Sequence, residues 1–187
     1  MIFDELAHQL QERQPLPPLC PTNTHDSATS LRIENASDDE LFDSVASTPE
    51  PKAMRAACRA GLFLLNDDLE NSHRISQTIE TPTGSFWHAI MHRREGDFSN
   101  ANYWWQRVGE HPAFADVYTQ ALSTLQSDDG DNSVGFLKEL QRAGCWKPTH
   151  FVAQCETATV SGASTHALQK IQLAEITSLL NWCRARI

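Results

Sequence analysis

Histidines at helical spacing carry the clearest chemical signal in this 187-residue chain. His88 and His92 are four residues apart, and Glu95 follows three residues later. A rotation of about 100° per residue puts these three side chains on one face of a helix. Imidazole and carboxylate are ligands that transition metals accept, and histidines at i and i+4 can reach one ion. The spacing therefore predicts a metal or acid–base centre on this face.

A further candidate, His73, belongs to the preceding predicted helix. It follows Leu65 and Leu69 at intervals of four, so we expect it to point toward the helical hairpin packed beside it. Glu70 and His73 also have the E-x-x-H spacing by which ferritin-like bundles hold an ion, but the hairpin supplies no second pair. We expect one mononuclear site whose imidazoles act as metal ligands or as catalytic acid–base groups, formed by His73, His88, His92 and Glu95.

Arginines and aromatic residues crowd the same part of the chain. Between Trp87 and Pro112 lie three tryptophans, three histidines and three arginines. Guanidinium groups beside imidazoles and an indole suit a phosphate or carboxylate, and histidine exchanges protons near neutral pH. We therefore expect a small anionic ligand, bound by Arg74, Trp87, Arg93, Arg94, Tyr103 and Arg107.

The same residues allow a second interpretation, in which the protein is a non-catalytic helical interaction module. Arg94 has nearly the helical angle of Ile90, on the apolar side of its helix, and a buried guanidinium there needs an anion. In this interpretation the polar side chains form a structural network of ion pairs. The carboxylates available to Arg94 are those of Asp67, Glu95 and Asp97.

Helical periodicity places these candidates on a helix pair and a hairpin. Apolar residues recur at three- and four-residue intervals from Pro51 to Glu80, with a break expected at 66–68. After a turn at 81–84, residues 85–95 are predicted as a helix that ends at Gly96, and Asp97 or Ser99 begins the next.

The whole chain favours an all-α fold. No segment shows sustained alternation of apolar and polar residues, which strands would require. We predict a single compact multi-helix domain over residues 38–187, with a central hairpin that weakly resembles a tetratricopeptide repeat and a long C-terminal helix. That last helix carries apolar residues in several directions, so it is either central or the contact surface of a homo-oligomer.

The first 37 residues are predicted as a short helix followed by an arm. Phe3, Leu6 and Leu10 share one stripe, and the prolines from Pro15 onward end the helix. The Ser/Thr-rich stretch that follows predicts an irregular arm on the surface.

Composition excludes several classes of partner. A formal net charge of −9 and a pI near 5.3 argue against nucleic acid and against an anionic membrane surface. The five cysteines are far apart and include no C-x-x-C pair, which is typical of reduced thiols. With neither a secretory signal nor a membrane span expected, we predict a cytoplasmic protein. The only cofactor that the sequence suggests is a divalent transition metal.

The hairpin sequence resembles a signature of an uncharacterised family of soluble helical bacterial and fungal proteins. The resemblance covers Trp87–Pro112, in the pattern WHxIMHRREGDFxNAxYWxxRVGxHP, and extends back through Leu69–His73. The family has no established activity, so the resemblance implies no reaction. It implies only that certain residues belong together: His73, His88, His92, Arg93, Arg94 and Glu95.

Overall fold

The computed structural model describes residues 2–42, 49–127, 131–162 and 165–187, and all regular structure in these ranges is helical. The predicted all-α fold is confirmed. None of the helices in these ranges is both long and apolar enough to cross a bilayer. In chain order the helices are α1 Ile2–Gln11, α2 Ser27–Asn35, α3 Asp38–Phe42, α4 Pro49–Leu65, α5 Leu69–Ser76, α6 Pro82–Glu95, α7 Phe98–Val108, α8 Phe114–Gln126, α9 Asp131–Ala143, α10 Pro148–Ser161 and α11 His166–Arg184.

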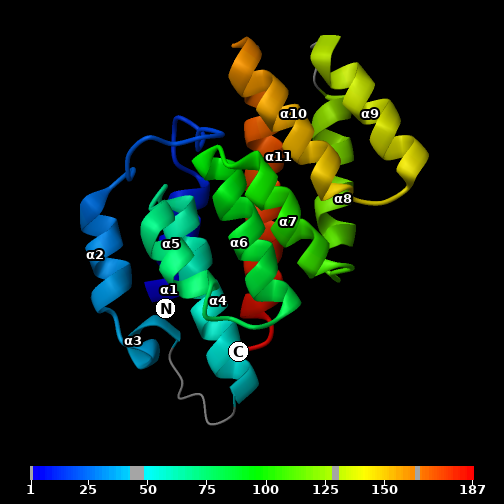
Figure 1. Ribbon diagram of the computed structural model, residues 1–187. Helices are drawn as coiled ribbons and strands as arrows, with labels where there is room; N and C mark the ends of the chain where they lie inside the picture. The colour runs from blue at the N-terminus through cyan, green and yellow to red at the C-terminus, as the bar shows by residue number, and fades with distance from the viewer. Residues whose placement is uncertain (1, 43–48, 128–130, 163–164) are drawn as a thin grey trace.

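The C-terminal helix α11 is central, which was one of the two alternatives that its apolar pattern left open. It packs against α4 and α8 and runs behind the hairpin in Figure 1, where it is red. Its buried residues point in several directions and include Ile171, Glu175, Ile176 and Leu179. The apolar surface of this helix therefore contacts its own chain.

The break predicted at 66–68 separates α4 from α5. Asp67 has a φ of +58°, a left-handed conformation that ends α4. The Asp68 carboxylate then accepts a hydrogen bond from the Asn71 N–H at 3.2 Å and caps α5. Because the chain reverses here, α5 lies against α4 on one side and α6 on the other.

The hairpin of α6 and α7 turns where the capping residues predicted, but α6 begins at Pro82, inside the predicted turn, because Thr81 caps it and a proline fits the first turn of a helix. Gly96 has a φ of +87° and ends α6, where a left-handed residue without a Cβ is favoured. Asp97 begins α7, and its side chain accepts a hydrogen bond from the Asn100 N–H at 3.0 Å. The two helices pack closely together near the centre of the molecule in Figure 1.

The prediction of an irregular arm was wrong for residues 27–35, which form helix α2. Asp26 caps this helix by accepting a hydrogen bond from the Ala28 N–H. On its inner side the Ser30 hydroxyl donates to Asp68 at 2.6 Å and accepts from the Asn66 amide at 2.9 Å. The helix is therefore held largely by polar contacts, which produce no apolar periodicity in the sequence.

Two hydrophobic clusters make up the core. The larger gathers residues of α1, α4, α6, α7 and α11, and it includes Leu6, Leu10 and Ile33 from the first 37 residues. The smaller lies among α8, α9, α10 and α11. Phe98 and Phe114 pack against both clusters, so the described helices form one continuous domain.

Candidate metal centre

Three of the four predicted ligands come together where α5 meets α6. His73 of α5 and His88 and His92 of α6 each offer one ring nitrogen, and these three atoms lie within 4.8 Å of one another. The His73 ring centroid is 4.6 Å from that of His88 and 5.3 Å from that of His92. The shared face predicted from two helices is therefore present.

The His88 ring is enclosed and polar at the same time. It is stacked between the rings of Trp104, at a centroid distance of 3.9 Å, and His92, at 4.8 Å. Its Nδ1 is buried and has no hydrogen-bond partner among the residues that the structure describes. Burial lowers the pKa of His88 to about 3, and nearby His92 and His73 add to this effect. At neutral pH the ring is uncharged and keeps a lone pair that can bind a metal.

Two polar neighbours hold the His92 ring. Its Nδ1 lies 3.0 Å from the Glu95 carboxylate, and the Asn100 amide nitrogen lies beside the ring, 3.1 Å from Nε2 and 3.3 Å from Nδ1. Burial lowers the pKa of His92, although its hydrogen bond to Glu95 acts in the opposite direction. This imidazole too is neutral at pH 7.

Glu95 lies outside the close group of ligand atoms, although its helical angle placed it on the same face. It belongs to the last turn of α6, its side chain is 55% exposed, and it binds the ring of His92. Carboxylates that accept the second N–H of a metal-binding histidine fix its tautomer and orientation. The Glu95 carboxylate contacts Nδ1 of His92 in this way. Glu70, the other acid considered, is exposed on α5.

The three imidazoles are spaced more widely than in a loaded site. Tetrahedral zinc with bonds of about 2.0–2.1 Å places two ligand nitrogens about 3.4 Å apart. Binding would therefore draw the nitrogens together by up to about 1.4 Å. Three imidazoles leave the fourth tetrahedral position open.

Arg93 and Arg94 point away from this group, into buried ion pairs. Arg93 pairs with Glu175 of α11 at 2.6 Å, and both side chains are almost fully buried. Arg94 pairs with Asp67, one of the carboxylates that the sequence offered it, and donates to the Leu64 carbonyl. Burial opposes the charge on Arg93, but the charge and hydrogen bond of Glu175, together with Cys155 and Cys20, raise the pKa of Arg93 overall. These two predicted ligand-binding residues therefore have internal anions as partners.

Trp87, Tyr103 and Arg107 have different surroundings. Trp87 is fully buried in the main core. Tyr103 is 52% exposed, and its hydroxyl accepts a hydrogen bond from Arg107 at 3.2 Å. Within the described part of the chain, the contacts of Arg107 are with Tyr103 and Trp104, and it makes no ion pair.

Arg107 and Trp104 also line a cleft of about 590 Å³. The cleft lies where the end of α5 and the start of α6 face α7, and its other residues are Ser76, Gln77, Ile79, Glu80, Thr81, Pro82 and Ser85. Trp104 contacts both the cleft and the His88 ring, so the cleft adjoins the histidine group.

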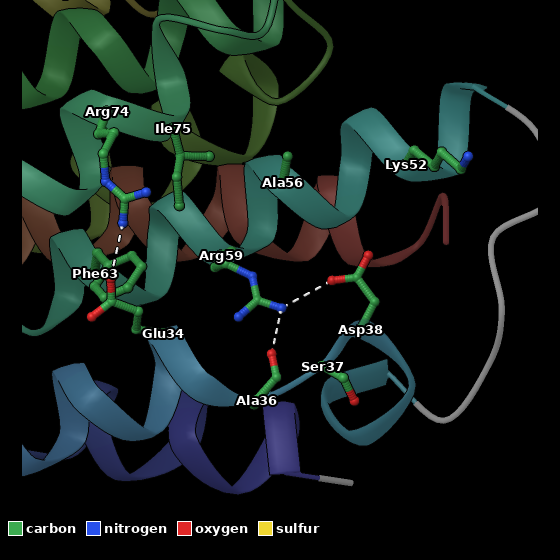
Figure 2. Close-up of a pocket in the computed structure, with 10 residues that line it drawn as sticks. All are labelled: Glu34, Ala36, Ser37, Asp38, Lys52, Ala56, Arg59, Phe63, Arg74 and Ile75. Atoms are coloured by element: carbon green, nitrogen blue, oxygen red, sulfur yellow. Dashed lines mark hydrogen bonds and ion pairs between the residues drawn. The ribbon is translucent and has the colours of Figure 1, made fainter.

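Arg74 belongs to a different cleft, of about 450 Å³, formed by residues of α2, α3, α4 and α5. Figure 2 shows its guanidinium directed at Glu34, 3.3 Å away, while Arg59 bonds the Ala36 carbonyl and Asp38. Lys52 also lines this cleft, near the N-terminal end of α4. The structure therefore does not bring Arg74 and Arg107 together.

Sequence reasoning missed two contributors to the site. Asn100 was not among the predicted site residues, and its amide nitrogen contacts the His92 ring. Trp104 was not among the predicted site residues either; it is partly buried and stacks on His88. The eight-residue spacing of Asn100 from His92 across the Gly96 turn was the available signal, since the two helices of a hairpin face each other.

Fold and site together define an all-helical protein with a group of three close imidazoles, two of them buried. No protein-family model matches this chain, and neither the curated proteins nor the solved structures give a significant match.

Proposed function

We propose that His73, His88 and His92 bind one divalent transition-metal ion, with Zn²⁺ the preferred metal, at a small-molecule site. The observation that carries this proposal is the convergence of three imidazole nitrogens from two helices to within 4.8 Å. Imidazole is a ligand that suits Zn²⁺, Cu²⁺ and Ni²⁺. The lowered pKa values of His88 and His92 support it further, because protons then compete weakly with the metal.

A site of this type is open rather than structural. Structural zinc sites use four protein ligands, whereas sites that bind or activate small molecules use three and leave one position for water or substrate. A bound Zn²⁺ lowers the pKa of its water to about 7 and polarises an oxygen atom of a ligand. Three histidines with Glu95 outside the group fit the open type.

The cleft beside Trp104 is the place for the small anionic ligand in this proposal. Arg107 supplies a cation without a carboxylate partner in the described residues, and Trp104 supplies an aromatic surface next to His88. An anion that enters here meets the guanidinium first and the metal centre behind Trp104. Glu80 also lines the cleft, which favours a ligand small enough to stay on the Arg107 side.

A Zn²⁺ titration of the purified, metal-stripped protein tests the proposal. We expect one equivalent to bind to the wild type, and the double variant His88→Ala/His92→Ala to lose this binding. The matched control is His150→Ala/His166→Ala, which removes two exposed imidazoles. Binding that is absent from the wild type, or equal in all three proteins, would overturn the proposal.

The second candidate is the non-catalytic interaction module, which the buried ion pairs favour. Asp67 bonds both Arg94 and Arg13, and Arg93 pairs with Glu175, so charged side chains connect the N-terminal segment, α6 and α11. If the histidines only extend this network, the double variant His88→Ala/His92→Ala unfolds at a lower temperature and the wild type binds no metal. If the double variant instead keeps the thermal midpoint of the wild type but loses its metal binding, the histidines are not part of this structural network.

A further inference from the structure

We infer that the cleft in Figure 2 binds a small amphipathic carboxylate, that is, an anionic head group with a hydrocarbon chain of medium length. The cleft has a volume of about 450 Å³, which is within the range of small-molecule sites. His73, His88 and His92 are not among the described residues that line it. The cleft is therefore a second ligand site, independent of the proposed metal centre.

Apolar side chains from several elements line part of this cleft. Ala56 and Phe63 belong to α4, Ile75 belongs to α5, and Ala36 follows the end of α2. Phe63 is fully buried, whereas Ala36, Ala56 and Ile75 are only partly buried, so water reaches apolar surface inside a concave site. A hydrocarbon chain that covers this surface is favoured by the hydrophobic effect, and a purely polar ligand gains nothing from it.

The charged residues of the cleft leave one cation without an acid. Asp38 pairs with Arg59 at 2.9 Å, and Glu34 pairs with Arg74 at 3.3 Å. Lys52 lines the cleft too, and it makes no ion pair or hydrogen bond in the described part of the chain. Three cations and two carboxylates give the cleft an excess positive charge in a protein whose formal net charge is −9. The head group that this charge favours is an anion.

The spacing along α4 places the cation at one end of the apolar surface. Lys52 precedes Ala56 by four residues and Phe63 by eleven, so the three side chains share one face of the helix. Figure 2 shows Lys52 and Phe63 at opposite ends of this row. Arg59 lies between them and donates to carbonyl groups at the end of α2, so it holds the wall of the cleft in place. A carboxylate at Lys52 thus lets its chain run over Ala56 toward Ile75.

The test measures the binding of octanoate to the full chain by chemical-shift titration. Hexanoate has a shorter chain, and 1-octanol has the same chain without the charge. Lys52→Met removes the cation, and Ala56→Phe fills the cleft with a ring. The matched controls are Lys170→Met and Ala153→Phe, at exposed positions on α11 and α10, and circular dichroism checks that each variant folds.

We expect octanoate to saturate one site in the wild type. Hexanoate should bind about tenfold more weakly, because two buried methylene groups are lost. Lys52→Met should weaken octanoate by about two- to fivefold, the effect of one exposed ion pair, and leave 1-octanol unchanged. Ala56→Phe should abolish the binding of both. If this variant does not fold, Ile75→Asp replaces it, because a carboxylate in the cleft should repel octanoate.

Three results would overturn the inference. The first is octanoate that saturates no single site in the wild type. The second is octanoate that binds the blocked variant as tightly as its control. The third is a Lys52→Met variant that binds octanoate as tightly as Lys170→Met, or that loses 1-octanol to the same extent. The Zn²⁺ titration is a separate measurement, so failure of this site leaves the proposed metal centre standing, and the reverse also holds.

Discussion

At the scale of single residues, burial decides what each histidine does. His88 and His92 are enclosed by aromatic rings and by each other, so their neutral forms are favoured. His111 is buried elsewhere, between Phe86 and Trp182, and is also neutral. Hydrogen bonding separates His88 from His111: both nitrogens of His111 have partners within the protein, whereas the buried Nδ1 of His88 has none among the described residues.

Glu95 provides the first prediction at this scale. Its carboxylate orients His92 through Nδ1, so Glu95→Gln should weaken Zn²⁺ binding by about tenfold. This is the lower end of the effect expected for a residue that hydrogen-bonds a metal ligand, because the Glu95 side chain is half exposed. Competition titration with a zinc chelator measures the change. Glu156→Gln, an exposed acid on α10, is the control. Equal affinities in all three proteins would show that Glu95 does not orient a ligand.

His111 provides a pH-dependent prediction that is independent of metal. Its Nδ1 accepts from the Ala113 N–H, its Nε2 contacts Thr83, and burial with Arg186 lowers its pKa to about 4. Between about pH 6.5 and 4 the unfolded chain binds a proton here that the folded chain does not, so stability falls as the pH falls.

The variant His111→Asn keeps an acceptor near Ala113 but cannot titrate. The difference in unfolding free energy between wild type and variant should shrink by roughly 2 kcal/mol from pH 7 to pH 5. Urea unfolding at the two pH values measures it, and exposed His150→Asn is the control. A difference that is the same at both pH values contradicts a depressed pKa.

At the scale of elements, close helix packing brings the ligands together. α4 supports both α5, which bears His73, and α6, which bears the other two histidines. Gly61 permits this approach, because a Cβ there would lie 2.8 Å from Leu180 of α11 and 2.8 Å from the Trp87 ring of α6.

Gly61→Ala should therefore destabilise the protein by about 1–3 kcal/mol through overpacking, even though alanine is the better helix former. Gly135→Ala in α9 is the matched control, because its Cβ would have no neighbour within 4 Å. Helix propensity alone predicts that the control is more stable than the wild type by up to about 1 kcal/mol. Chemical denaturation measures the unfolding free energy of both variants. Equal changes in Gly61→Ala and Gly135→Ala would contradict overpacking at Gly61.

The buried pair of Arg93 and Glu175 joins α6 to α11 and gives another prediction. Glu175→Gln leaves the buried guanidinium without its anion and should cost about 3–5 kcal/mol, whereas Arg93→Met/Glu175→Leu should recover most of that stability. If the ion pair and the histidine group are separate, the double variant still binds one equivalent of Zn²⁺. Loss of Zn²⁺ binding in a folded double variant would show that the two are one network.

At the scale of the whole molecule, the sequence predicted the parts that depend on local signals. The turn of the hairpin followed from Gly96 and Asp97, although α6 begins at Pro82 and not at residue 85 as predicted, and the closeness of His73 to His88 followed from helical angles. Helix α2 was missed because its inner face is polar and is satisfied by Asp68 and Asn66, residues far away in the sequence.

The remaining differences also come from tertiary contacts. Helical angle placed Glu95 with the histidines, but the end of α6 leaves it half exposed. Arg93 looked available to a ligand until α11 supplied Glu175, 82 positions away, as its partner. Long-range pairing of this kind leaves no local pattern, so a sequence indicates which side chains need partners without indicating where the partners are.

The X-ray absorption spectrum of the protein loaded with one equivalent of Zn²⁺ tests most directly whether His73, His88 and His92 share one metal ion. We predict three imidazole nitrogens at about 2.0–2.1 Å and one further oxygen ligand, with one imidazole fewer in His73→Ala. A spectrum with at most one imidazole, or one that His73→Ala leaves unchanged, would contradict a shared three-histidine centre.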